Sequence, residues 1–238
     1  MTKTIATLLF STLLLSGFSQ QQTNLLASDA FRAMGDQPSF GMMQTKKNTE
    51  FGISGTHYFK ETLSPGKIKM FKNERYIEGL KIRYNIFYEM LEVVANEVFF
   101  AAENEQISDF VIQEGETTHH FYNSTLYAGD LLPLGYIRMI HMGDEISVFA
   151  KDIKKEKKHD SSEPYSSIKN EIEYLDEIDY YIYEKSSKDF IEVKSRKKLV
   201  DRFPVLENFA VTKSNLKKES FLAEMAVYMN KQSISTTR

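Results

Sequence analysis

In the run GLKIRYNIFYEMLEVV, residues 79–94, apolar and polar side chains alternate with a period of two from Leu80 to Ile86. Successive side chains of a β-strand point to opposite faces of a sheet, so this pattern predicts a strand with one buried face. The expected buried face is Leu80, Ile82, Tyr84 and Ile86, and the expected solvent face is Lys81, Arg83 and Asn85. The chain is expected to bend at residues 87–89 and to continue as a second strand over residues 90–94.

Short runs of this kind follow one another between residues 51 and 194, separated by short polar turns. Strands are expected at residues 67–72, 80–86, 90–94, 98–101, 107–113 and 117–122, and in two hairpins that turn at residues 143–144 and 186–188. The first of these strands follows an expected Pro-Gly turn at residues 65–66. Short turns favour pairing between neighbours. We therefore expect an antiparallel meander, either a curled sheet or a partly closed barrel.

A charged segment interrupts this pattern. Residues 151–171, KDIKKEKKHDSSEPYSSIKNE, are dense in Lys, Ser and Glu. This composition predicts a solvated, mobile loop inside the β domain. The alternative interpretation is a docking site for an acidic partner.

The period changes to that of a helix after Val193. Ser195 is expected to cap a short helix that ends at Pro204, and residues 206–211 are expected to form a second one, with Pro204 just outside its start. The last apolar stripe is Phe221, Leu222, Met225, Tyr228 and Met229. We expect two or three helices over residues 195–231, packed on the sheet, and a frayed tail at residues 232–238. The fold class is therefore α+β, mainly β.

The amino terminus has the layout of a cleavable signal peptide. Lys3 precedes an apolar stretch at residues 5–15, and the small residues Gly17 and Ser19 precede an expected cut before Gln20. Residues 1–19 would be removed, and residues 20–50 would form a flexible linker. The sequence contains no cysteine, which excludes lipid attachment through a cysteine, disulfides and thiolate metal sites. We expect a periplasmic or secreted protein with no membrane-spanning helix after cleavage.

The charge balance and the absence of known motifs argue against several classes of function. The chain has 30 Lys and Arg against 33 Asp and Glu, a net charge of −3, which does not favour nucleic-acid binding. The sequence has no G-x-S-x-G, no phosphate-binding G-x-x-x-x-G-K-[ST] and no dinucleotide fingerprint. No cofactor is expected.

The histidines are weak candidates for a metal site. His119 and His120 are adjacent, so on a strand they point to opposite faces and do not readily share one metal ion. One of them could join His141 and a carboxylate such as Asp109 or Asp130. The alternative is one solvated histidine and one that is hydrogen-bonded at the sheet face.

A group of tyrosines is the candidate binding surface. Alternation places Tyr181 and Tyr183 on one face of a strand and Tyr180 on the other. Exposed tyrosines make favourable contacts with sugars and peptides. The alternative is that these rings complete the packing of the sheet.

Three segments resemble a family of secreted Bacteroidota proteins with no assigned activity. They are a Pro-Gly turn followed by EGLKIRYNIFYEMLEV, then YYIYEKSSKDFIEVKSRKKLVDRFP, and a C-terminal helix that ends in VYMN; FSQQQ after the signal also fits. The resemblance covers residues 64–230 and implies export and fold. Together with the absence of catalytic motifs, it indicates a non-catalytic binding or structural module of the cell envelope, with a protein, a glycan or another envelope component as partner. The alternative is an exported hydrolase whose histidines and carboxylates assemble only in three dimensions.

Overall fold

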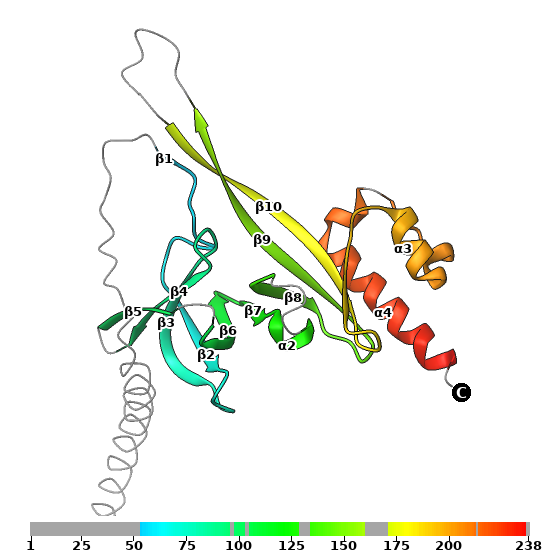
Figure 1. The fold of residues 1–238 in the computed structure, drawn as a ribbon, viewed down its shortest axis with the longest axis horizontal. Coiled ribbons are helices and arrows are strands. Elements are labelled where there is room, and N and C mark those ends of the chain that lie inside the picture. Colours follow the sequence, from blue (N-terminus) through cyan, green and yellow to red (C-terminus); the bar gives the residue numbers. More distant parts are fainter. Residues whose placement is uncertain are drawn as a thin grey trace, which may run out of the picture.

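The computed structural model describes residues 53–95, 98–102, 105–128, 134–159, 171–212 and 214–236. The expected signal peptide and the expected linker lie outside these residues. The described chain is mainly antiparallel β-sheet followed by helices, which confirms the expected α+β class (Figure 1).

The described strands form a single eleven-stranded sheet. They are β1 (Ile53–Ser54), β2 (Ser64–Met70), β3 (Ile77–Asn85), β4 (Met90–Ala95), β5 (Val98–Ala102), β6 (Ile107–Glu114), β7 (Thr117–Asn123), β8 (Tyr136–His141), β9 (Ile146–His159), β10 (Glu171–Glu184) and β11 (Asp189–Glu192). A short helix, α2 (Thr125–Ala128), follows β7. The expected Pro-Gly turn is wrong, because Pro65 and Gly66 lie inside β2 and pair with β3.

The strands form two meanders rather than one. Strands β2 to β5 pair in sequence, and so do β6 to β11. The two meanders join where β6 pairs with β2 instead of with β5. In addition, β1 pairs with β10 in the parallel direction. Alternation within single strands carries no signal for either of these long-range pairings.

The first meander is curled. Strand β5 lies four positions from β6 in the sheet order, a distance of about 19 Å in a flat sheet. Only four residues separate the end of β5 from the start of β6, and they reach about 17 Å when fully extended. The sheet must therefore curve to bring β5 toward β6, and it stays open, because β5 and β6 do not pair.

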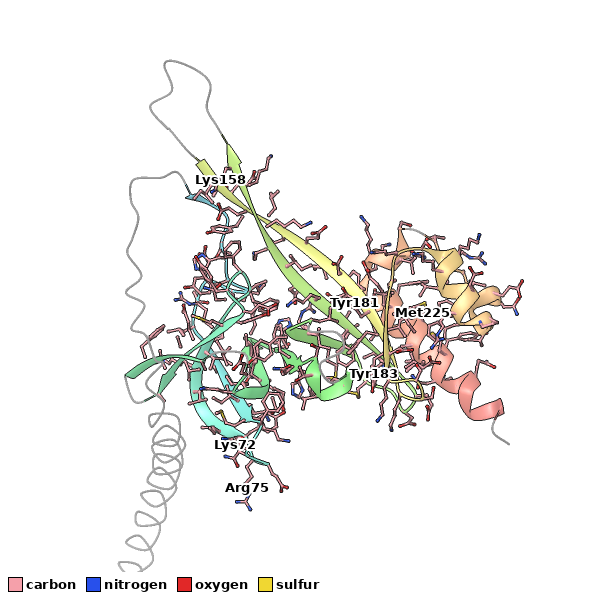
Figure 2. All side chains as sticks on the ribbon, viewed as in Figure 1. Lys72, Arg75, Lys158, Tyr181, Tyr183 and Met225 are labelled. Carbon is pink, nitrogen blue, oxygen red and sulfur yellow. The ribbon has the colours of Figure 1, made fainter. Side chains whose placement is uncertain are left out.

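Strands β9 and β10 form a long ribbon that extends beyond the rest of the sheet (Figure 1). The expected loop over residues 151–171 is wrong at its ends, because β9 continues to His159 and β10 begins at Glu171. Opposite charges face each other across the ribbon and favour this pairing. The ion pairs are Lys154 with Asp176, Lys155 with Glu177 and Lys157 with Glu173. Lys158 marks the far end of the ribbon (Figure 2).

The helices cover one face of the second meander. They are α3 (Arg196–Arg202), the 3₁₀ helices η2 (Pro204–Asn208) and η3 (Asn215–Lys217), and α4 (Glu219–Thr236). Ser195 caps α3 as expected, since its hydroxyl accepts a hydrogen bond from the Lys198 N–H. The second short helix begins at Pro204 rather than after it. The last helix continues to Thr236, beyond the end expected at residue 231.

Three clusters of buried side chains hold the fold together. The first lies inside the curled meander and includes all four residues of the expected buried face, from Leu80 to Ile86. The second lies between the helices and β8 to β11, where Met225 of α4 points toward the ribbon (Figure 2). The third consists of Ile137, Phe149 and Tyr183 and lies on the opposite face of the same strands. None of the helices in the described residues is both long and apolar enough to cross a membrane.

Two residues of the expected solvent face are not in solvent. Asn85 is buried, and its side chain accepts a hydrogen bond from the Tyr88 N–H in the following turn. Arg83 is half-buried under the Tyr58 ring, and its Nε lies 2.7 Å from Glu92 Oε2. Only Lys81 is exposed as expected.

Candidate functional site

The two adjacent histidines point to opposite faces of β7, as their spacing predicts. His119 lies on the face of the first core, with its ring 5.0 Å from the Phe59 ring and its Nε2 3.3 Å from Glu114 Oε2. His120 lies on the other face, where its Nε2 is 3.3 Å from Asp109 Oδ1. His120 therefore lies close to Asp109, one of the two carboxylates expected from the sequence as possible metal ligands. The other, Asp130, lies outside the described residues.

His141 does not join either histidine. It lies at the end of β8, opposite Val148 of β9. The part of the chain that the structure describes contains no group of three or more His, Asp or Glu residues placed to hold one metal ion. The proposed combination of His119 or His120 with His141 is therefore not formed by these residues.

The residues around His120 form a connected polar group, which we call the Asp109 network. The Tyr76 hydroxyl donates to Asp109 Oδ1 and lies 3.0 Å from His120 Nε2. The Tyr122 hydroxyl lies 3.2 Å from His120 Nδ1. The Ser108 hydroxyl donates to Asp109 Oδ2 at 3.0 Å. Asp109 is buried, whereas Tyr76, His120 and Tyr122 are half-buried, so a carboxylate beneath the surface holds two partly exposed rings directly and the third, Tyr122, through His120.

Strand geometry explains how these residues meet. Asp109 of β6 lies directly opposite Tyr122 of β7, and His120 is two residues before Tyr122 on the same face. Tyr76 comes from the turn that follows β2, a strand that also pairs with β6. The His120–Tyr122 spacing is visible in the sequence as a period of two. The contribution of Tyr76 is not visible, because it depends on the β2–β6 pairing.

The electrostatics of the network favour hydrogen bonding over proton transfer. Burial raises the pKa of Asp109, but hydrogen bonds from His120, Tyr76 and Ser108 together bring it below its usual value. Burial and the neighbouring Asp109 carboxylate raise the pKa of the Tyr76 hydroxyl. Burial also raises the pKa of the Tyr122 hydroxyl. At neutral pH the carboxylate is ionised and both phenols keep their protons, which suits fixed donors around a fixed acceptor.

The order of groups differs from that of a hydrolase triad. In such a triad the histidine lies between the serine and the carboxylate, so that it can take the proton of the serine. Here Asp109 lies between Ser108 and His120, since each of them contacts a different oxygen of the carboxylate. Ser108 is also buried, and its single hydroxyl proton faces two acceptors, Asp109 Oδ2 and the Lys69 carbonyl oxygen, each 3.0 Å from Oγ. The network does not activate this serine.

Aromatic rings continue the same face beyond the network. The Tyr122 ring stacks on His120 at 4.3 Å and contacts Tyr127 at 5.8 Å, and the Tyr127 ring in turn contacts Tyr183 and Phe149 at 5.0 and 5.1 Å. Through these ring contacts, the third cluster of buried side chains extends from the Asp109 network to β10. Together they form a continuous face of polar and aromatic side chains opposite the helices.

Of the three tyrosines expected to form a binding surface, two are buried in the packing of the sheet. Tyr180 and Tyr183 are each 8% exposed. Tyr180 packs in the second cluster, on the side of the helices, and Tyr183 packs in the third cluster. Tyr183 is labelled at its place on β10 in Figure 2. Tyr181 is half-buried against Phe190, at 6.3 Å between ring centroids, and burial raises its pKa to about 12. The rings alternate between faces as the sequence predicts, but Tyr180 and Tyr183 complete the packing instead of forming an exposed surface.

A second polar site lies between the two meanders. A cavity of about 320 Å³ is lined by Phe59, which precedes β2, by Ile86, which follows β3, and by His119, Arg138 and Lys154 from the second meander. The Arg138 guanidinium bonds both oxygens of Asp152, at 2.9 and 3.0 Å, and both oxygens of Glu219. These pairs satisfy most of the N–H groups of Arg138. We therefore infer that this arginine holds the start of α4 in place and has few donors left for a ligand.

Comparison of the chain with protein-family models, with curated proteins and with solved structures gives no match.

Proposed function

We propose that the protein is an exported, non-catalytic binding module of the cell envelope, and that its ligand is a glycan held at the Asp109 network. The observation that carries this proposal is the arrangement of three half-exposed rings: a buried carboxylate fixes Tyr76 and His120 directly, and His120 in turn fixes Tyr122. Fixed rings offer contact area at low entropic cost, and their polar tips can exchange hydrogen bonds with hydroxyl groups. Sugars present both apolar faces and hydroxyls.

The binding test uses purified cell-wall polysaccharide and a panel of immobilised glycans. Tyr122→Ala removes the ring that joins the network to the aromatic face, so we expect binding to fall about tenfold or more. Tyr88→Ala is the matched control, because Tyr88 is an exposed tyrosine in the turn between β3 and β4. Equal binding by both folded variants would contradict the proposal.

The hydrolase remains the second candidate because the network does bring a histidine and a carboxylate together. Its test is the release of reducing sugar ends from the same polysaccharides. Turnover by the wild-type protein that disappears in Asp109→Asn, while binding persists, would favour the enzyme over the binding module.

Export has its own test. The proposed signal peptide predicts that the mature protein begins at Gln20. Amino-terminal sequencing of protein recovered from the periplasm or the medium checks this, and an exported chain that retains Met1 contradicts it.

A further inference from the structure

Part of one edge of β10 is open. On one side β10 pairs with β9 along its whole length. On the other side β1 pairs with Ile172 and Glu173, and β11 pairs with residues 181–184. Among the strands that the structure describes, none pairs with residues 174–180 on this side. The open stretch is about 23 Å long, which is room for a short extra strand between β1 and β11.

The register shows which backbone groups face the gap. The Tyr180 carbonyl accepts a hydrogen bond from the Val193 N–H at 2.8 Å, so Tyr180 directs its backbone toward the side of β11. Backbone groups alternate along a strand, so Asp176 and Ile178 direct their N–H and C=O groups the same way. These four groups have no hydrogen-bond partner on that side within the described part of the chain.

A groove runs along this edge. Its volume is about 500 Å³, and it is lined by β10, by the residues that follow β11 and by η3. Ile178, which is 40% exposed, Val193 and Leu216 provide its apolar lining. Ile178 shares a strand face with Tyr180, which packs against the helices, so the groove has an apolar wall on the helix side.

The charged lining has more acidic than basic residues. Asp176, Glu177, Asp179 and Glu192 line the groove, together with Lys194 and Lys217. Asp176, Glu177 and Glu192 pair with lysines, whereas Asp179 is in no ion pair with any described residue. Burial, Glu192 and Glu177 raise the pKa of Asp179, so an added cation here would relieve repulsion between the carboxylates.

The charge of the groove distinguishes between two possible occupants, a second copy of this chain and a basic segment of another protein. A second copy that paired antiparallel through the same edge would bring the carboxylates of Asp176, Glu177 and Asp179 close to those of the other copy, and like charges opposite each other are destabilising. A segment with basic side chains would instead meet complementary charge.

We propose that the open edge of β10 is a strand-addition site for an extended segment of a partner protein that alternates basic and apolar side chains. The backbone of this segment would bond Asp176 and Ile178, its apolar side chains would lie beside Ile178 and Leu216, and its basic side chains would lie near Asp179 and Glu192. Main-chain hydrogen bonds supply affinity in this mode of recognition, and alternate side chains supply specificity. The site is separate from the Asp109 network and does not depend on the proposed glycan.

The test measures binding of synthetic peptides by fluorescence anisotropy. The probe is a labelled peptide with three Lys-Val repeats, compared with its Glu-Val counterpart. We expect the Lys-Val peptide to bind about tenfold or more tightly than the Glu-Val peptide, with an affinity that falls as salt is added. Equal binding of the two peptides, or no binding of either at millimolar concentration, overturns the proposal.

A substitution in the protein and a modification of the peptide test whether backbone hydrogen bonds hold the added strand. Ile178→Pro removes an N–H that faces the gap and leaves the pairing with β9 intact, so affinity should fall about tenfold. Ile178→Val is the matched control and should bind like the wild type. A peptide N-methylated at alternate residues, tested on the wild-type protein, should lose binding even if the proline variant fails to fold. Unchanged binding of this peptide, or a dimer in ultracentrifugation that Ile178→Pro abolishes, overturns the proposal.

Discussion

Tyr84 places a hydroxyl group in the middle of the first core. The side chain is 1% exposed, and its ring lies 5.3 to 5.6 Å from the rings of Phe110, Phe121 and Tyr136. The hydroxyl has no hydrogen-bond partner within the described residues. Burial raises its pKa well above the usual value, so the group stays neutral. An unpaired buried hydroxyl lowers stability by about 1–3 kcal/mol.

Tyr84→Phe should therefore stabilise the protein by about 1 kcal/mol, because it keeps the ring and removes the unpaired group. The measurement is urea unfolding. Tyr136→Phe is the matched control: the Tyr136 hydroxyl donates to the Ile107 carbonyl at 3.4 Å, so this change should leave stability equal or lower. A clear loss of stability in Tyr84→Phe would show that its hydroxyl is paired.

Asp109 makes the stability of the protein depend on pH in the acidic range. A carboxyl whose folded pKa lies below its unfolded pKa binds fewer protons when folded, so stability rises with pH between the two values. The pKa of Asp109 is lowered by its hydrogen bonds, so its contribution is complete above the unfolded pKa of about 3.9 and is lost as pH falls through the folded pKa. Wild type and Asp109→Asn should differ most near neutral pH and converge below about pH 4. Urea midpoints between pH 2 and 7 check this, and a constant difference contradicts it.

At the scale of elements, Asn230 joins α4 to the turn between β8 and β9. Its Oδ1 accepts from the Glu145 and Ile146 N–H groups, both at 3.0 Å, and its Nδ2 donates to the Ile146 carbonyl at 2.8 Å. A Cβ on Gly143 would lie 2.2 Å from this Nδ2, so the turn needs glycine there. Asn230 is the last residue of the VYMN motif, and its amide explains why an asparagine suits that position.

Asn230→Ala should lower the free energy of unfolding by about 2–3 kcal/mol, since it removes several hydrogen bonds and leaves backbone groups of the turn unpaired. Lys231→Ala, at the exposed neighbouring position, should change it by less than about 0.5 kcal/mol. Thermal unfolding followed by circular dichroism measures both. Similar effects at the two positions would mean that the side chain of Asn230 does not hold the turn.

Local patterns predicted most of these elements and few of their long-range partners. Alternation located β3, β4 and the hairpin turns, and the cap at Ser195 located α3. The outer part of the ribbon was missed, because a segment rich in lysine and glutamate predicts a loop when its partners on the other strand are not considered. The Asp109 network was found only in part, because Tyr76 reaches it through the β2–β6 pairing.

At the scale of the whole molecule, the two meanders share their interior. Phe121 and Tyr136 belong to the second meander, yet they pack in the first core beside Tyr84. Lys151 of β9 also pairs with Glu89 in the turn between β3 and β4. Damage to one meander therefore exposes apolar surface of the other. We expect the two to unfold as a single cooperative unit.

Ile82→Asp tests this coupling. Ile82 is fully buried in the first meander, and an unpaired charge at that position should destabilise the protein by more than about 4 kcal/mol. If the meanders are one unit, amides of β10, far from the substitution, should lose hydrogen-exchange protection together with those of β3. Lys81→Asp is the matched control because Lys81 is exposed, whereas the neighbouring Arg83 is bonded to the buried Glu92. Protection retained in β9 to β11 while β3 exchanges freely would show that the second meander and its helices fold independently.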